Sequence, residues 1–362
     1  MTKPFLSVII PVYNGSLYLR ETIKSILQQP CKDYELLLLN DGSKDNSLEI
    51  CNEFQGENVK VYNHLNMGVS KTRNRGIELA QGDAIIFVDQ DDAMRSGFYT
   101  EEMRCQIEEQ LNKNIDLIIT GVWYGDAELR RGFFRSIEKL KKGVYEGRNN
   151  AISWGNTFTF NTNLFSRRLF FDEQGNATPV RFFDLSLDVE TIFRHITQYY
   201  ARKILFSDQY SFCVRRNNEN SVSSNWDWLK VYPVKCDAYY NLIRWHKTYF
   251  PNDTESISGA MKSFLNVISD MIVANQRNGS DLEMLCENVS KSIYYDDLLK
   301  MIKSYPDESV LISDFIASPL SLNKRLHISW FRRLVKLRWK SYAKLNSQKS
   351  FDLRKNILKI SN

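Results

Sequence analysis

The first hundred residues alternate between short apolar runs and segments with helical spacing. Four apolar, β-rich runs have the length of a strand, at 5–11, 34–39, 59–62 and 84–88. Between the first two runs, Leu19, Ile23, Ile26 and Leu27 share one face of a predicted helix over 17–29. Strands that alternate with helices and short loops predict an α/β domain with a mainly parallel sheet.

Polar residues collect at the points where these strands end. They occur at 11–14, at 40–43, at Asn66 and Gly68, and at 89–92. In open α/β sheets, ligands bind in the crevice outside the carboxyl ends of the strands. The pattern therefore predicts a single pocket along this edge, which we call the rim.

The last of these strand ends, Asp89-Gln90-Asp91-Asp92, places three carboxylates within four positions directly after a buried strand. Mg²⁺ and Mn²⁺ take carboxylate oxygens and often share their ligands with substrate phosphates. Taken alone, the motif fits a solvated acidic turn equally well. The shared rim favours a metal site that binds a diphosphate.

Four ordered motifs resemble family 2 glycosyltransferases. They are Ser-Val-Ile-Ile-Pro-Val-Tyr-Asn at 7–14, Asn-Asp-Gly-Ser-Lys-Asp at 40–45, Asn-x-Gly-Val-Ser-x-x-Arg-Asn-x-Gly at 66–76 and Phe-Val-Asp-Gln-Asp-Asp at 87–92. The match continues more weakly to about residue 225. The resemblance implies a GT-A fold, with a nucleotide-binding half at 1–100 and an acceptor half at 101–225. It also implies an inverting transferase that uses a nucleotide-diphosphate sugar with Mn²⁺ or Mg²⁺.

The resemblance also assigns roles along the rim. Asp41 accepts a hydrogen bond from a uracil ring, although Asp-Gly is also a common tight turn. Arg73 reaches phosphate from its helix, or is simply a solvated helix charge. Asp91 binds the metal directly, Asp89 lies near the ribose and the metal, and Asp92 supports the turn. The remaining predicted nucleotide-sugar contacts are Pro11, Val12, Tyr13, Asn14, Asn66, Gly68 and Gln90, of which Gln90 needs no special role.

Sugar transfer to a hydroxyl needs a general base. The family places an acidic pair before a short helix, and the corresponding sequence here is Asp188-Val189-Glu190. Glu190 is our first choice for the base and Asp188 the second, with Asp188 as a helix cap the structural alternative. Val189 stands where the family has an acid.

A basic residue near the end of the family's catalytic segment folds over the donor diphosphate. Arg215 or Arg216 is the predicted clamp, because negative charge grows on the leaving group in the transition state. Side chains alternate along a strand, so only one of the two points to the site. The charged stretch 129–147 shows no clear period and is predicted to be a surface connection or an acceptor-side loop.

From 226 to 362 the pattern changes to helices. Beyond Lys324 the only acidic residue is Asp352, and basic residues recur every fourth position from Arg332. We expect a basic amphipathic tail that contacts an anionic membrane surface, with packing on the protein as the alternative and nucleic acid not expected.

Bulk properties agree with a cytoplasmic protein, or one peripheral on the inner face of the cytoplasmic membrane. The 362 residues carry a formal charge of +5, and no apolar run approaches the roughly 20 residues that span a bilayer. The N-terminus lacks a signal-peptide pattern. The six cysteines form no C-x-x-C pair, which argues against a zinc site or a disulfide framework.

The sequence therefore predicts a metal-dependent hexosyl- or N-acetylhexosaminyltransferase of bacterial polysaccharide synthesis. It would move a sugar from a UDP-sugar to a saccharide or lipid-linked saccharide. One alternative is a non-catalytic nucleotide-sugar-binding or scaffold protein, which the departure at Val189 leaves open. A nucleotidyltransferase fits less well, because a glycine- and lysine-rich loop is missing after the first strand.

Overall fold

The computed structural model describes residues 3–126, 129, 132–135, 143–147, 163–185, 189–215, 228–257, 259–260, 292 and 297. The chain forms two compact units, Met1–Trp226 and Asp227–Asn362. Asp188, Arg216 and the predicted basic tail lie outside the described residues, so their assignments stay predictions.

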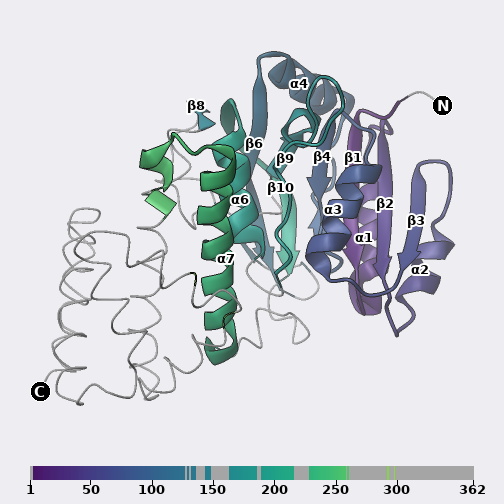
Figure 1. The fold of residues 1–362 in the computed structure, drawn as a ribbon. Coiled ribbons are helices and arrows are strands. Elements are labelled where there is room, and N and C mark those ends of the chain that lie inside the picture. The colour runs from purple at the N-terminus through teal and green to yellow at the C-terminus, as the bar shows by residue number, and fades with distance from the viewer. Residues whose placement is uncertain are drawn as a thin grey trace, which may run out of the picture. The chain divides into compact units, whose positions relative to one another are not determined.

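The first unit is built on one sheet with the strand order β3-β2-β1-β4-β9-β6-β10-β5 (Figure 1). In sequence order, the first four strands are β1 (Leu6–Val12), β2 (Tyr34–Asp41), β3 (Val59–His64) and β4 (Ala84–Phe87). All of their pairings are parallel. Helices α1 (Ser16–Leu27), α2 (Ser47–Glu53) and α3 (Val69–Leu79) connect them. The predicted α/β fold of the first hundred residues is confirmed.

The second half of this unit extends the same sheet with mixed pairing. Its strands are β5 (Ala93–Met94), β6 (Ile115–Gly125), β7 (Gly132–Arg135), β8 (Gly143–Glu146), β9 (Asn163–Ser166) and β10 (Lys203–Arg215), and its helices are α4 (Glu101–Asn112) and α6 (Val189–Tyr200). Strand β9 lies antiparallel between β4 and β6, whereas β6 and β10 are parallel. The two halves of the unit therefore share one continuous sheet.

The described part of 129–147 contains two strands, where an irregular surface connection or acceptor-side loop was predicted. β7 pairs with β6, and β8 pairs with β10, both antiparallel. Each strand has only four residues, and charged neighbours hide any alternation in the sequence. Their backbone hydrogen-bond partners come from longer strands, so a weak local pattern is enough to form them.

The core lies between the parallel strands and the helices. Val8, Leu36 and Ile86 are fully buried and lie at matching positions of three neighbouring strands. Helix α3 packs closely on β1 at Gly76, where an added Cβ would lie 2.5 Å from Cγ2 of Ile9. A larger residue at 76 would push this helix away from the sheet, and with it the side chains that α3 carries to the rim.

The second unit begins with α7 (Trp228–Tyr249), which buries Cys236, Leu242 and Ile243. Among the described residues, no helix is both long enough and apolar enough to cross a membrane.

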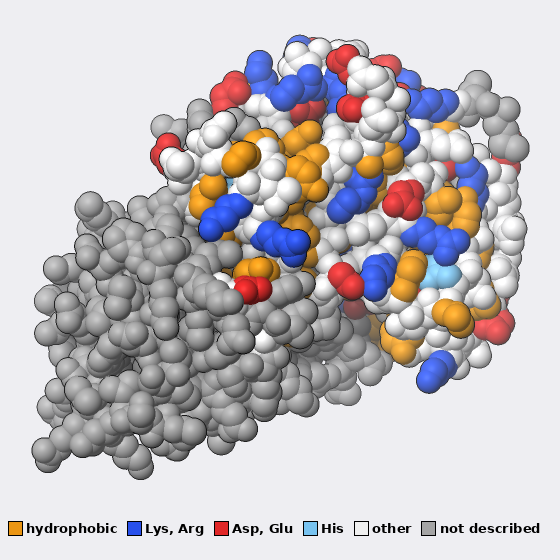
Figure 2. Space-filling view, viewed as in Figure 1, with side chains coloured by type: hydrophobic (Ala, Val, Ile, Leu, Met, Phe, Trp, Pro, Cys, Tyr) orange, Lys and Arg blue, Asp and Glu red, His pale blue; other side chains and the backbone are white. Residues whose placement is uncertain are grey.

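On the face drawn in Figure 2, Lys and Arg side chains of the described residues lie interspersed with Asp and Glu.

Candidate active site

The predicted rim forms where β1, β2, β3 and β4 end. Their parallel pairing sets Val12 beside Asn40, and Asp41 beside His64. Val88 N, at the end of β4, donates to the carbonyl of Ile9 in β1. The Asp89–Asp92 turn therefore starts next to the end of β1, so the polar strand ends that were predicted from the sequence share one edge.

The Asp89–Asp92 turn is held in place by hydrogen bonds from α1. The Thr22 hydroxyl is fully buried and lies 2.9 Å from the carbonyl oxygen of Gln90 and 2.7 Å from that of Asp92. Within the turn, Asp92 N donates to the carbonyl of Asp89 at 3.1 Å. Such anchoring distinguishes this turn from a freely solvated acidic loop.

Gln90 ties the same turn to the loop after β1. Its Oε1 accepts from Tyr13 N at 2.8 Å, and its Nε2 donates to Tyr13 O at 3.0 Å. The side chain occupies the space beside Gly15, where a Cβ would lie 2.3 Å from Gln90 Cδ. Gln90 therefore has a specific structural role, which the sequence did not predict.

Arg73 joins two carboxylates that are far apart in the sequence. Its Nη2 donates to Asp89 at 2.9 Å and its Nη1 to Glu190 at 2.7 Å. The Arg73 side chain is only 3% exposed, whereas those of Asp89 and Glu190 are 34% and 42% exposed. Both terminal nitrogens of Arg73 thus donate to protein carboxylates in this structure. The predicted contact of Arg73 with phosphate stays a prediction.

Glu190 lies in the first turn of α6, and its carboxylate accepts the hydrogen bond from Arg73 that links it to the rim. Burial acts to raise the pKa of its carboxyl, but the positive charge and hydrogen bond of Arg73 outweigh this effect and hold the pKa below the ordinary value. The carboxylate is therefore ionised at neutral pH, and its side chain is still partly open to solvent.

Asp41 holds the loop before α3 in this structure. Its carboxylate accepts from Met67 N at 2.7 Å and from Gly68 N at 3.0 Å, and it is buried. Gly42 is required beside it, because its φ is +68° and a Cβ would lie 2.7 Å from the backbone nitrogen of Asn66. Asn66 is exposed in this loop. The predicted contact of Asp41 with a nucleobase stays a prediction.

Asn14 links the loops after β1 and β2. Its backbone nitrogen donates to Ser43 Oγ at 3.0 Å, and its side-chain oxygen accepts from Lys44 N at 2.8 Å. The residue has a φ of +50°, a conformation that asparagine tolerates better than most residues. Tyr13 beside it is 44% exposed, and Pro11 and Val12 are more buried. Of the predicted contacts Pro11, Val12 and Tyr13, only the tyrosine is widely open to solvent.

Arg215 is buried against α1. Its Nη2 donates to Glu21 at 2.5 Å and its guanidinium lies 4.5 Å from the centre of the Tyr18 ring. Its backbone nitrogen donates to the buried carboxylate of Asp92 at 3.1 Å. In this structure Arg215 therefore fastens β10 to the acidic turn, and its predicted role as a diphosphate clamp remains untested.

Asp89 and Asp91 fit a divalent cation by the chemistry of their oxygens. Among the described residues no three His, Cys, Asp or Glu side chains form a cluster that alone could hold a metal. Mg²⁺ typically needs only one or two carboxylates, because water and substrate phosphates complete its shell. Asp89 and Asp91 supply two such carboxylates on one turn, and their binding of a metal stays a prediction.

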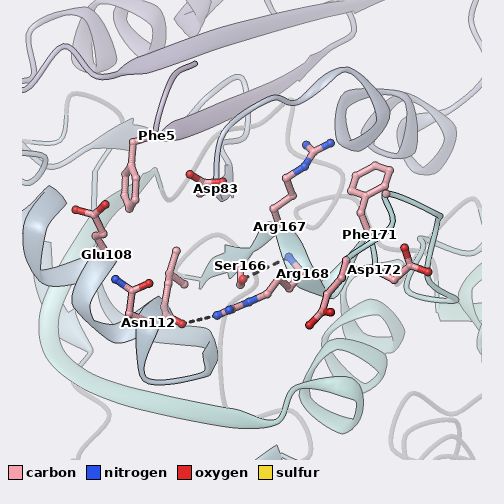
Figure 3. A pocket seen from close by; sticks show the side chains of 12 residues that line it. Phe5, Asp83, Glu108, Asn112, Ser166, Arg167, Arg168, Phe171 and Asp172 are labelled. Carbon is pink, nitrogen blue, oxygen red and sulfur yellow. Dashed lines mark hydrogen bonds between the residues drawn. The ribbon is translucent and has the colours of Figure 1, made fainter. Parts of the chain in front are cut away.

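A separate hollow of about 350 Å³ opens at the opposite edge of the sheet (Figure 3). It lies beside Phe5 and Asp83, which precede β1 and β4, and none of the predicted site residues lines it. In this hollow, the guanidinium of Arg168 donates to the carbonyl of Leu111, and the backbone nitrogen of Arg168 donates to Ser166 Oγ (Figure 3). The hollow is therefore separate from the predicted site residues that the structure describes.

Sequence reasoning missed Thr22, the role of Gln90 and the bridge through Arg73. No local signal marks Thr22, because a threonine inside a helix face is common. Arg73 and Glu190 are separated by more than a hundred residues, so no spacing rule relates them. The motif around Arg73 was visible in the sequence, but its partners were not.

A family model described as glycosyl transferase family 2 matches residues 7–175. An uncharacterised glycosyltransferase of Haemophilus influenzae is 32% identical over 230 residues, which cover 62% of this chain and 84% of that protein. The glycosyltransferase EpsJ of Bacillus subtilis is 28% identical over 278 residues, which cover 73% of this chain and 74% of EpsJ.

Among solved structures, residues 1–349 of S. aureus TarS in complex with UDP-GlcNAc resemble this chain with a TM-score of 0.52. The match covers 83% of this chain and 92% of that chain, at 19% sequence identity. This likeness concerns the fold, and it confirms the predicted GT-A architecture.

Proposed function

The chain belongs to glycosyltransferase family 2, and we propose that it transfers a sugar, with inversion, from a UDP-sugar to a hydroxyl of a saccharide or lipid-linked saccharide in bacterial surface-polysaccharide assembly. The observation that carries this proposal is the Arg73 bridge. It links Asp89 on the acidic turn to Glu190 at the start of α6. One guanidinium thus connects the residue expected at the donor with the residue expected to activate the acceptor.

In the proposed reaction, Glu190 accepts the proton of the acceptor hydroxyl as the hydroxyl oxygen attacks the anomeric carbon. The bond from that carbon to the diphosphate breaks on the opposite face, so configuration inverts in one displacement. The Glu190 side chain is 42% exposed, which supports this role because an acceptor hydroxyl can reach the carboxylate.

Asp91 and Asp89 would hold a divalent cation, whose positive charge offsets the charge that grows on the departing diphosphate. Thr22 and Gln90 keep the turn that carries both carboxylates in one geometry before the donor arrives. A preorganised turn lowers the cost of binding, because little needs to be ordered at that moment. The UDP-GlcNAc complex of TarS supports a UDP-sugar as donor.

The first experiment measures the thermal shift that UDP with Mn²⁺ produces. Asp91→Ala is expected to abolish the shift. Asp83→Ala is the matched control: this carboxylate lies at the opposite edge of the sheet and pairs with Lys3, so the shift should stay as in the wild type. An unchanged shift in Asp91→Ala contradicts the assignment of the metal and diphosphate.

The second experiment screens nucleotide sugars by release of free nucleotide and then measures transfer with the best donor. Glu190→Gln is expected to lower transfer at least a hundredfold while binding of UDP with Mn²⁺ is retained. If Glu190→Gln transfers normally and Asp188→Asn does not, the base is Asp188. If both variants transfer normally, acid-base catalysis by this segment is refuted.

A further inference from the structure

Several side chains of helix α3 contact α6 and the segment that leads into it. Ser70 Oγ donates to the carbonyl of Leu185 at 3.2 Å. The Asn74 amide forms two hydrogen bonds with the backbone of Phe182, one to the carbonyl and one from the nitrogen, both 2.9 Å long. Arg73 contacts Glu190 a few residues further on. This helix therefore fixes the position of the predicted base from the donor side of the site.

Arg73 itself rests on a stack of aromatic rings. Its guanidinium lies 5.4 Å from the centre of the Phe182 ring. Phe182 stacks on Phe193 with centroids 3.6 Å apart and ring planes 4° from parallel. Phe193 is three residues after Glu190 on α6, so one helix turn separates the ring from the carboxylate.

Phe87 extends the same cluster to the acidic turn. Its ring meets Phe182 at 5.4 Å and Phe193 at 6.1 Å, both edge to face. Phe87 ends β4, two residues before Asp89. The backbone segments that carry Asp89 and Glu190 are thus packed on one rigid cluster, with Arg73 spanning the two carboxylates above it.

We propose that Arg73 is a positioning residue for the transfer reaction: its guanidinium fixes the carboxylate of Glu190 relative to Asp89, and it does not bind the donor diphosphate. The inference rests on the proposed function, in which Glu190 is the base. Arginine suits this position better than lysine, because its planar fork presents separate N–H groups to two carboxylates in a fixed geometry, whereas lysine offers a compact point charge. The position also buries the guanidinium almost completely, which favours fixed protein partners over an arriving ligand.

Arg73→Lys tests the proposal, with Arg75→Lys on the same helix as the matched control. A misplaced catalytic group can cost about a hundredfold in rate. We therefore expect Arg73→Lys to lower kcat by about a hundredfold while the Kd for UDP with Mn²⁺ changes by less than about threefold. Arg75→Lys should change neither quantity.

A double-mutant cycle separates positioning from phosphate binding. In the Glu190→Gln background, Arg73→Lys should cost less than about threefold in kcat, because the group that it positions is already disabled. Two results overturn the inference alone: the same large loss in both backgrounds, or a Kd for UDP with Mn²⁺ that rises tenfold or more in Arg73→Lys. Full transfer by Glu190→Gln instead refutes the base assignment, and the inference falls with it.

Asn74→Asp provides a second variant in case Arg73→Lys does not fold. It removes the amide donor to the carbonyl of Phe182 and leaves Arg73 in place. The same pattern is expected, a lower kcat with an unchanged Kd for UDP with Mn²⁺. An unchanged kcat would show that α3 does not position the base, and would overturn the inference.

Discussion

Removing one hydroxyl tests whether the acidic turn is preorganised. Thr22→Val keeps the shape of the side chain but deletes the donor shared by the carbonyls of Gln90 and Asp92, which lie 2.9 and 2.7 Å away. Thr22 is fully buried, so water cannot easily replace the hydroxyl. The variant therefore leaves the buried carbonyl of Asp92 and the partly buried carbonyl of Gln90 without this donor.

The size of the effect follows from that geometry. Leaving a buried acceptor unsatisfied costs about 1–3 kcal/mol. In a unit of this size, each kcal/mol shifts the melting temperature by roughly 2–4 °C, so we expect a fall of roughly 2–12 °C. Binding of UDP with Mn²⁺ has to restore the turn, and the free energy that this costs cannot exceed the stability lost in the variant. The affinity should therefore fall by no more than about tenfold for each 1.4 kcal/mol of lost stability.

Urea unfolding measures the stability, and titration with UDP and Mn²⁺ measures the affinity. Thr72→Val is the matched control, because the Thr72 hydroxyl is also buried but has no hydrogen-bond partner within the described part of the chain. Its replacement should be neutral or stabilising. If both variants unfold at the same urea concentration, the Thr22 hydroxyl does not anchor the turn and the reasoning is refuted.

Three further predictions address the loop, the base and the tail. Gly15→Ala should displace the Gln90 side chain and weaken binding of UDP with Mn²⁺ in a titration, with little change in unfolding; unchanged affinity would contradict the role of Gln90. The lowered pKa of Glu190 means that its pairing with Arg73 stabilises the fold at neutral pH and is lost as pH falls through that pKa. Glu190→Gln should therefore destabilise the protein at pH 7, and the difference from wild type in urea unfolding should shrink below the ordinary glutamate pKa; a constant difference would contradict the pairing. Removing the chain after Asn323 should release the protein from anionic vesicles in a sedimentation assay, and persistent binding would place the membrane contact elsewhere.

The nucleotide-binding half could be predicted because its signals are local. Strands β1, β2 and β4 are largely apolar runs, polar residues lie at or just after the ends of the four strands, and parallel pairing brings those ends to one edge. The structure places Asp41 and Asp89 on that edge as expected. What local signals could not provide is the set of partners that each side chain finds.

The partners were missed because they come from distant parts of the chain. Arg73 was expected to face phosphate, and it reaches Glu190 from a different half of the unit. Gln90 was expected to need no special role, yet its side chain forms hydrogen bonds with both the backbone nitrogen and the carbonyl oxygen of Tyr13. Strand β9 shows the same limit, since nothing in Asn163–Ser166 indicates an antiparallel place between β4 and β6.

The insertion of β9 has a consequence for how the chain folds during synthesis. Until residues 163–166 leave the ribosome, β4 has β1 on one side and an unpaired edge of buried residues on the other. Such an edge can pair with another nascent chain and start aggregation. A fragment that ends near residue 100 should therefore precipitate or bind chaperones, whereas one that includes β9 closes this edge.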